Sequence, residues 1–261
     1  MKIGVFDSGI GGISVLCALV KEKPYNDYYY LGDNLNAPYG DKTENELKTL
    51  ADKNIKVLLE YGVDIIVVAC NTVSTTCKKY ILKKYNKIPF CFITPQITKK
   101  ILKDRCVVFC TEKTANNLKK TKKYITKSDN ICIVGCSGLV EKIERNFFNF
   151  NSQFLNHYCK GIGQDIKSVV LGCTHYPLIA TFFREKFPLA KFYDGTKPLI
   201  ATLTKIERKN FKNINLVNAF YNGKIFFLGN CGAQNYRIYA TFSKKITKSG
   251  KNFTKSGWQL P

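Results

Sequence analysis

The sequence predicts an α/β protein made of two pseudo-symmetric, doubly wound halves with mainly parallel sheets. Apolar runs alternate with helical patterns up to about residue 95, and the same order begins again near residue 105. Residues 63–76 and 168–178 each hold a branched apolar run that ends in a cysteine and leads into a helical pattern. Continuous apolar runs are typical of strands buried on both faces of a parallel sheet. We therefore expect each half to place one cysteine at the carboxyl end of a strand.

The first half contains the elements of one doubly wound sheet. We expect strands at 2–6, 28–32, the apolar run from 63 and 88–93, and helices at 14–20, 44–61 and from 71 through 83. The helix at 44–61 has a clear apolar side, formed by Leu47, Leu50, Ile55, Leu58 and Leu59. A Thr-Pro pair at 94–95 marks the end of this half.

The second half repeats the order. We expect strands at 105–110, 131–135, 168–171 and 187–193, and helices after Thr114, around Glu141, over 147–159, from Pro177 and from Pro198. Proline suits the first turn of a helix because its missing N–H would have no partner there. Residues 211–235 are expected to return as extended segments that extend the first sheet. The lysine- and glycine-rich tail after Ser243 is left unassigned.

Composition gives the bounds of a globular protein. The chain has 261 residues, 45% hydrophobic and 23% charged, which is ordinary for a folded domain. It opens directly into a strand, with no leader pattern and no run long enough to span a membrane. We expect a cytoplasmic protein. Its 11 cysteines include no C-x-x-C pair, and His157 near Cys159 has no complete zinc ligand set. No metal site is expected.

The net charge of +22 raises the possibility of nucleic-acid binding. Only five of the 41 basic residues are arginine, the side chain that most often makes bidentate hydrogen bonds to bases and phosphates. The lysines are spread along the chain rather than gathered in one aromatic-interleaved stripe. We therefore expect a solvated basic surface, no specific nucleic-acid partner, and at most weak polyanion binding at low salt.

The first strand ends in an acid and a glycine-rich turn. Asp7 and Ser8 are followed by glycines at 9, 11 and 12, and then by a helix. Glycines there leave backbone N–H groups free at a helix start, which suits an anion, although the spacing is not that of a dinucleotide fold. A tight turn alone would also explain the glycines. The acid at the end of a buried strand favours a functional role, because burying it is costly unless it is used or paired.

Four roles are open for Cys70 and Cys173. They are a redox disulfide, a cysteine hydrolase with His175 as base, a purely structural role in the core, and proton transfer across a substrate. The last needs one base on each side of a planar intermediate, with Asp7 and His175 suited to poise the thiols. It also needs donors for a carboxylate, and the candidates are Ser8, Asn71, Thr72, Thr111, Thr114 and Thr174.

Five motifs make the chain resemble the glutamate racemases, in the cofactor-independent aspartate/glutamate racemase family. They are GVFDSGIGG at 4–12, GD at 32–33, PYG at 38–40, ACNT at 69–72 and LGCTHYPL at 171–178. The resemblance implies two α/β domains, residues 1–95 plus about 206–261 and residues 96–205, with the active site in the cleft between them. It also implies interconversion of L- and D-glutamate for peptidoglycan, with no pyridoxal phosphate, other cofactor or metal.

The resemblance also implies roles for individual residues. Cys70 and Cys173 would be the acid/base pair, assisted by Asp7 and His175, with Glu141 supporting the second side. The implied substrate contacts are Asp7, Ser8, Tyr39, Gly40, Asn71, Thr72, Thr111, Thr114, Thr174 and His175. We also expect a homodimer. The alternatives are a racemase of aspartate or another amino acid, and a catalytically weakened member that binds polyanions through its basic surface.

Overall fold

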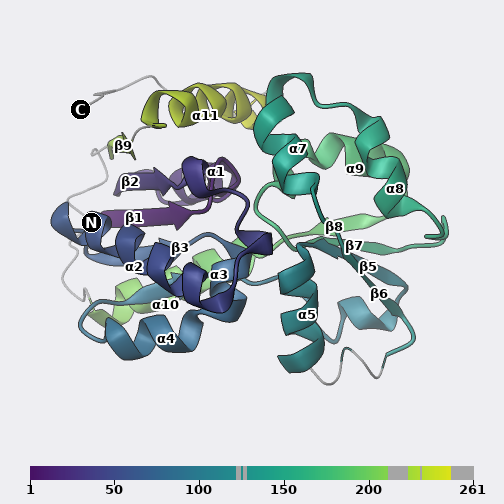
Figure 1. Ribbon diagram of the computed structural model, residues 1–261, viewed down its shortest axis with the longest axis horizontal. Helices are drawn as coiled ribbons and strands as arrows, with labels where there is room; N and C mark the ends of the chain where they lie inside the picture. Colours follow the sequence, from purple (N-terminus) through teal and green to yellow (C-terminus); the bar gives the residue numbers. More distant parts are fainter. Residues whose placement is uncertain (122–124, 126–127, 211–222, 230, 248–261) are drawn as a thin grey trace.

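A computed structural model of the chain describes residues 1–121, 125, 128–210, 223–229 and 231–247. Most of the extended segment expected over 211–235 and most of the unassigned tail lie outside these residues. The described chain forms two parallel sheets, each covered by helices (Figure 1). Within these ranges, no helix combines the length and the apolar character needed to cross a membrane.

The first sheet has the strand order β4-β3-β1-β2-β9, and all of its pairs are parallel. Its strands are β1 (Lys2–Asp7), β2 (Asp27–Gly32), β3 (Ile65–Val68), β4 (Phe90–Phe92) and β9 (Ile225–Leu228). β9 comes from the end of the chain and pairs with β2, so one strand of the expected returning segment does extend this sheet.

The second sheet has the order β6-β5-β7-β8 and is also parallel throughout. Its strands are β5 (Cys106–Cys110), β6 (Ile131–Gly135), β7 (Ser168–Leu171) and β8 (Lys191–Tyr193). When β1 to β4 are matched in turn to β5 to β8, the two orders are the same. The predicted fold class, two pseudo-symmetric doubly wound halves, is confirmed.

The helices follow the strands as the alternating pattern predicts. In the first half they are α1 (Gly12–Glu22), α2 (Glu44–Glu60), α3 (Asn71–Thr76) and α4 (Lys78–Lys84). The later helices are α5 (Glu112–Thr121), α7 (Leu139–Asn146), α8 (Asn156–Cys159), α9 (Ala180–Lys186), α10 (Thr196–Asn210) and α11 (Gly232–Thr247). The 3-10 turns are η1 (Asn34–Asn36), η2 (Tyr39–Asp41), η3 (Ile101–Lys103), η4 (Phe147–Asn149), η5 (Ser152–Leu155) and η6 (Tyr176–Ile179).

Three helical expectations differ from the structure. The helix expected through residue 83 breaks into α3 and α4 at Cys77. The helix expected over 147–159 is instead η4, η5 and the short α8, because the Asn151 side chain accepts a hydrogen bond from the Gln153 N–H and starts a new turn. Residues 232–235, expected to be extended, begin α11, whose buried Ile238 and Tyr239 belong to the same core cluster as α1.

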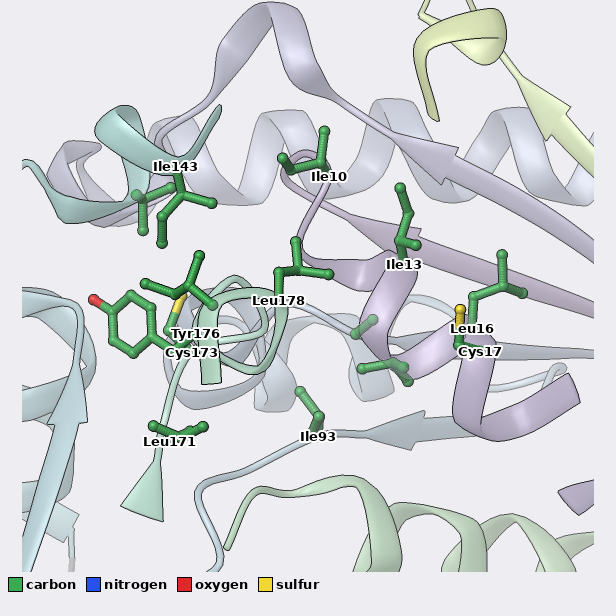
Figure 2. Close-up of a cluster of buried hydrophobic side chains, with 14 of the residues drawn as sticks. Ile10, Ile13, Leu16, Cys17, Ile93, Ile143, Leu171, Cys173, Tyr176 and Leu178 are labelled. Atoms are coloured by element: carbon green, nitrogen blue, oxygen red, sulfur yellow. The ribbon is translucent and has the colours of Figure 1, made fainter. Parts of the chain in front are cut away.

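One apolar cluster joins the two halves. It includes Ile10 from the loop before α1, Ile13 from the first turn of α1, and Ile143 and Leu178 from the second half. Figure 2 shows these side chains together, with Cys173 among them. Since the cluster runs without a break from one half to the other, it holds the carboxyl ends of the two sheets against each other. On the face of the first sheet that α1 covers, α10 packs on α1 and β4, and α11 packs on α1 and β9.

Candidate active site

The two predicted cysteines occupy equivalent places in the two halves. Cys70 follows β3 and caps α3, and Cys173 follows β7, the strand that matches β3. Asp7 is the last residue of β1, next to β3 in the sheet. The strand order reverses between β1 and β3, and this switch point is where open α/β sheets bind ligands. The fold therefore brings the predicted acid/base groups to the edges where a site belongs.

On the first side, Cys70 faces Ser8 and Asp7. The Cys70 thiol donates to Ser8 Oγ, with the two atoms 3.8 Å apart. Burial raises the pKa of the Cys70 thiol well above its usual value, and the charges of Asp7 and Cys173 act in the same direction. This thiol is therefore held in its protonated form.

Asp7 is itself fully buried and anchored. Its Oδ2 accepts the Gly12 N–H at 2.7 Å, at the start of α1. Burial raises the pKa of Asp7 above its usual 3.8, although the nearby His175 charge and the N–H groups of Gly12 and Ser8 oppose the shift. A carboxyl group poised in this way can exchange a proton more readily than a solvated aspartate.

On the second side, Cys173 faces His175. The Cys173 Sγ and His175 Nδ1 atoms are 3.7 Å apart, and His175 Nε2 donates to Glu144 Oε1 at 2.5 Å. Burial alone would lower the pKa of His175, but the hydrogen bonds and charges of Cys173 and Glu144 outweigh it and hold the pKa well above 6.5. The thiol, imidazole and carboxylate form a Cys–His–Glu series like those that activate nucleophilic thiols.

The acid that contacts His175 is Glu144, not the expected Glu141. Glu141 pairs with Arg145 on the exposed side of α7, at 3.0 Å. Glu144 lies three residues further along the same helix, where it meets His175. The i, i+4 spacing of Glu141 and Arg145 was the available signal, because such pairs typically occupy the solvent face of a helix.

Each half also supports the other half's groups. The Thr174 hydroxyl, from the second half, lies 3.4 Å from both carboxylate oxygens of Asp7. In return, the Ile10 N–H of the first half donates to Glu144 Oε1 at 2.9 Å. The Ser14 hydroxyl donates to the Thr174 carbonyl at 2.9 Å. Both sides are therefore complete only when the halves are together.

Two glycines of the first loop allow this close approach. A methyl group at Gly9 would lie 1.9 Å from Glu144 Oε1, and one at Gly11 would lie 2.3 Å from His175 Nδ1. The sequence suggested that this loop receives an anion. In the structure two acidic side chains of the protein meet its backbone: Glu144 at the Ile10 N–H and Asp7 at the Gly12 N–H.

Three of the other predicted substrate contacts, Thr72, Thr111 and Thr114, form a hydroxyl cluster. Thr72 and Thr111 lie 3.1 Å apart at their Oγ1 atoms, and Thr111 and Thr114 lie 3.0 Å apart. Gly40 packs on Thr111, and a methyl group at Gly40 would lie 3.1 Å from Thr111 Cβ. The Asn71 Oδ1 atom is buried and has no hydrogen-bond partner among the described residues.

Tyr39 is held by hydrogen bonds to groups other than the thiols. Its hydroxyl donates to Asp33 Oδ2 at 2.6 Å and accepts from the buried Asn54 side chain at 3.2 Å. These bonds fix the loop that carries Gly40.

The site is closed in this structure. Cys70 is 4% exposed and Cys173 is 6% exposed. A small cavity of about 10 Å³, lined in part by Gly40, Thr111 and Glu141, lies beside the hydroxyl cluster. That is about the room one water molecule needs. An amino acid can therefore reach the thiols only if the elements around them separate.

Comparison with known proteins places the chain among enzymes of one kind. No protein-family profile matches the chain. It is 36% identical to the glutamate racemase of Clostridium novyi (strain NT) over 245 residues, covering 87% of this chain and 90% of the relative. It is 35% identical to that of Clostridium botulinum (strain Alaska E43 / Type E3) over 261 residues, covering 95% and 97%. The structure of the Francisella tularensis glutamate racemase in complex with D-glutamate shares the fold, with a TM-score of 0.72, 24% identity and 93% of each chain covered.

Proposed function

The chain belongs to the glutamate racemase family, and on that premise we propose that it interconverts L- and D-glutamate with Cys70 and Cys173 as its two acid/base residues. The observation that carries the proposal is the placement of the two thiols. They come from matched strands, β3 and β7, and an acidic side chain lies near each: Asp7 acts on Cys70 through its charge, and Glu144 acts on Cys173 through His175. A single working cysteine would leave the second thiol and its partners without a use.

The proposed reaction moves protons only. One cysteine, as thiolate, takes the α-proton of glutamate, and the C–H electron pair stays on the α-carbon as a planar, carboxylate-stabilised carbanion. The opposite thiol then gives its proton to the other face, which inverts the centre. The protonation states of the two cysteines are exchanged at the end, and nothing is oxidised or reduced. No cofactor is required by this balance.

The surroundings of the two thiols assign their starting roles. Burial and the Asp7 charge favour the protonated form of Cys70, which makes it the acid. At Cys173, His175 can accept the thiol proton through Nδ1 while its Nε2–H stays bonded to Glu144. We therefore infer that the closed protein is set for one enantiomer and that turnover resets it for the other.

The hydroxyl cluster and Asn71 supply contacts for the rest of the substrate. Ser8, Thr72, Thr111, Thr114 and Thr174 offer hydroxyl donors for the carboxylates. The unpartnered Asn71 Oδ1 can accept from the α-ammonium group. The product D-glutamate would serve peptidoglycan synthesis. The homodimer expected from the sequence stays a prediction, which light scattering of the purified protein measures.

The test is racemisation by purified protein with no added cofactor, in D₂O. We expect wild type to exchange the α-proton and invert D-glutamate. Cys70→Ser and Cys173→Ser should each lose about 10²- to 10⁴-fold in rate, the usual worth of a general acid or base. Cys132→Ser, at an exposed cysteine, is the matched control. Full activity in either site variant would rule out the two-thiol scheme, and turnover of aspartate alone would rule out glutamate as the substrate.

A further inference from the structure

We propose that Asn34 and Asn235 are positioning residues that hold Glu144 against His175 and so prepare Cys173. The inference rests on the proposed function, since it assigns how one of the two bases is held. It concerns two side chains that none of the sequence motifs singled out, one of them on the C-terminal helix α11.

A continuous series of contacts joins α11 to the second thiol. Asn235 Nδ2 donates to Asn34 Oδ1 at 3.2 Å, and Asn34 Nδ2 donates to Glu144 Oε2 at 3.5 Å. The other oxygen of Glu144 receives His175, which lies against Cys173. Glu144 is thus gripped by the imidazole at one oxygen and by an amide at the other.

The chemistry of the groups fixes the direction of the series. A carboxylate can only accept, so Asn34 must present its NH₂ group to Glu144. The Asn34 carbonyl then faces Asn235, which must present its own NH₂ group. Both amides therefore direct their donor ends toward Glu144, so that Asn34 occupies Oε2 while Oε1 receives the Ile10 N–H and the His175 Nε2–H.

The burial of Asn235 is hard to explain by packing alone. The residue is 0% exposed, and its Oδ1 atom has no partner among the described residues. A buried amide that uses only its donor side costs stability, so an apolar residue would serve a purely structural position better. The loss of stability is explained if the Asn235 NH₂ group is needed to hold Asn34.

Gly32 makes room for the two amides. A methyl group there would lie 2.7 Å from the Gly9 carbonyl oxygen, 2.9 Å from Asn34 Oδ1 and 3.1 Å from Asn235 Nδ2. The glycine of the GD motif therefore has a physical reason in this chain. Adding a side chain at that position would push the two amides apart.

A second contact holds α11 to the same part of the second half. The Arg237 guanidinium stacks on the Phe148 ring, 5.1 Å from its centre, just beyond the end of α7. Figure 1 shows α11 reaching from the first half toward α7. The C-terminal helix thus braces the helix that carries Glu144, on top of the amide contacts.

The experiment compares Asn235→Ala and Asn34→Ala with Asn36→Ala. Asn36 lies in the same loop but bonds only Asp33 among the described residues, so it is the matched control. We expect Asn235→Ala and Asn34→Ala each to lose about 3- to 10-fold in kcat/KM, which is the contribution of one hydrogen bond, while the control stays near wild type. Asn34 is only half-buried, so its variant folds even if Asn235→Ala does not.

An isotope effect separates positioning from general damage. L- and D-glutamate have equal free energies, so any variant must lower kcat/KM equally in both directions. If Asn34 and Asn235 serve only Cys173, the primary kinetic isotope effect of α-deuteration on kcat/KM should rise for the enantiomer whose proton Cys173 removes. It should not rise for the other enantiomer. An unchanged or equally changed pair of isotope effects would overturn the proposal.

A second readout does not depend on activity. The chain has two histidines, His175 and the exposed His157. In ¹⁵N-histidine-labelled protein, the Nε2–H resonance of His175 should move in Asn34→Ala and in Asn235→Ala, while the resonance of His157 stays in place. In Asn36→Ala, the resonances of both histidines should stay in place. A His175 resonance that does not move would overturn the positioning role of Asn34 and Asn235, whether or not the protein racemises glutamate. Absence of racemisation in wild type would instead count against the proposed function.

Discussion

The two thiols have chemically different neighbours, although the two halves share one strand order. Cys70 is next to a carboxyl group and a hydroxyl, and Cys173 is next to an imidazole backed by a carboxylate. The first set favours a protonated thiol, and the second can take a thiol proton away. Two halves of the same topology thus give their cysteines different surroundings, as the proposed acid and base roles require.

Substitution of Glu144 tests which acid supports His175. Glu144→Gln keeps the shape but removes the charge, so we expect kcat to fall about 10- to 100-fold, the worth of a hydrogen bond to a charged group. Glu141→Gln, on the same helix but paired with Arg145 at the surface, should stay within about two-fold of wild type, because exposed pairs contribute little. The comparison needs only steady-state racemisation rates. A larger loss from Glu141→Gln would return the role to that residue.

The buried carboxyl of Asp7 should make the folded protein less stable as pH rises. Because its pKa is raised in the folded state, the folded protein holds this proton more tightly than the unfolded chain does. The free energy of unfolding therefore falls as the pH rises above 3.8, through the folded pKa. Asp7→Asn cannot ionise and keeps an acceptor for the Gly12 N–H.

We therefore expect Asp7→Asn to gain stability relative to wild type as the pH rises above about 4, while its racemisation rate falls. Urea unfolding at several pH values measures the first effect. A stability difference that does not change with pH would mean that Asp7 titrates alike in the folded and unfolded states.

At the scale of elements, the strands could be predicted and some helices could not. Runs such as Ile65–Val68 and Ser168–Leu171 are apolar throughout because both faces of a parallel strand are covered, and this signal is local. The start of α2 is equally local, since Thr43 and Glu46 form a capping box. The break over 147–159 depends on one asparagine, Asn151, and apolar periodicity does not record it.

The loop between β1 and α1 acts as an element on which the second half closes. Gly11 has φ −59° and ψ −40°, a conformation that alanine adopts freely. Gly11→Ala should therefore leave the backbone of the loop unstrained. The added methyl group would meet His175 Nδ1 and Thr174 Oγ1, at 2.3 and 2.6 Å.

We expect Gly11→Ala to reduce racemisation at least about 10-fold, because displacing a general base by about 1 Å is enough for such a loss. The urea midpoint of unfolding should change little, because the loop backbone stays unstrained. Activity near wild type would show that His175 can give way without harm. A loss of stability in proportion to the loss of activity would point instead to damage within the loop.

At the scale of the molecule, the parts of the site that lie within one half could be predicted, and the contacts across the halves could not. Cys70 with Ser8, and Cys173 with His175, follow from motifs and from the ends of strands. The choice of Glu144 over Glu141, and the approach of Asn34 to Glu144, depend on how two separate sheets meet. No local pattern encodes that relation, and side chains such as Asn34 read as ordinary loop residues.

The closed state of the whole molecule should control when the two thiols can react. Both are buried, whereas Cys132 is exposed and Cys106 lies in the core of the second sheet. If the halves part to admit an amino acid, Cys70 and Cys173 become accessible without unfolding, and Cys106 does not. Alkylation by iodoacetamide, followed by peptide mass spectrometry, gives a rate for each cysteine in the same sample.

We expect Cys132 to be alkylated first, Cys70 and Cys173 next, and Cys106 last. Added glutamate should slow Cys70 and Cys173 by a factor of about one plus the ratio of its concentration to its Kd, because a bound substrate favours the closed form. Cys132 should keep its rate and serves as the internal control. Equal rates for Cys106, Cys70 and Cys173 would mean that the site opens only when the protein unfolds. Glutamate would then have to reach the thiols by a path other than separation of the halves.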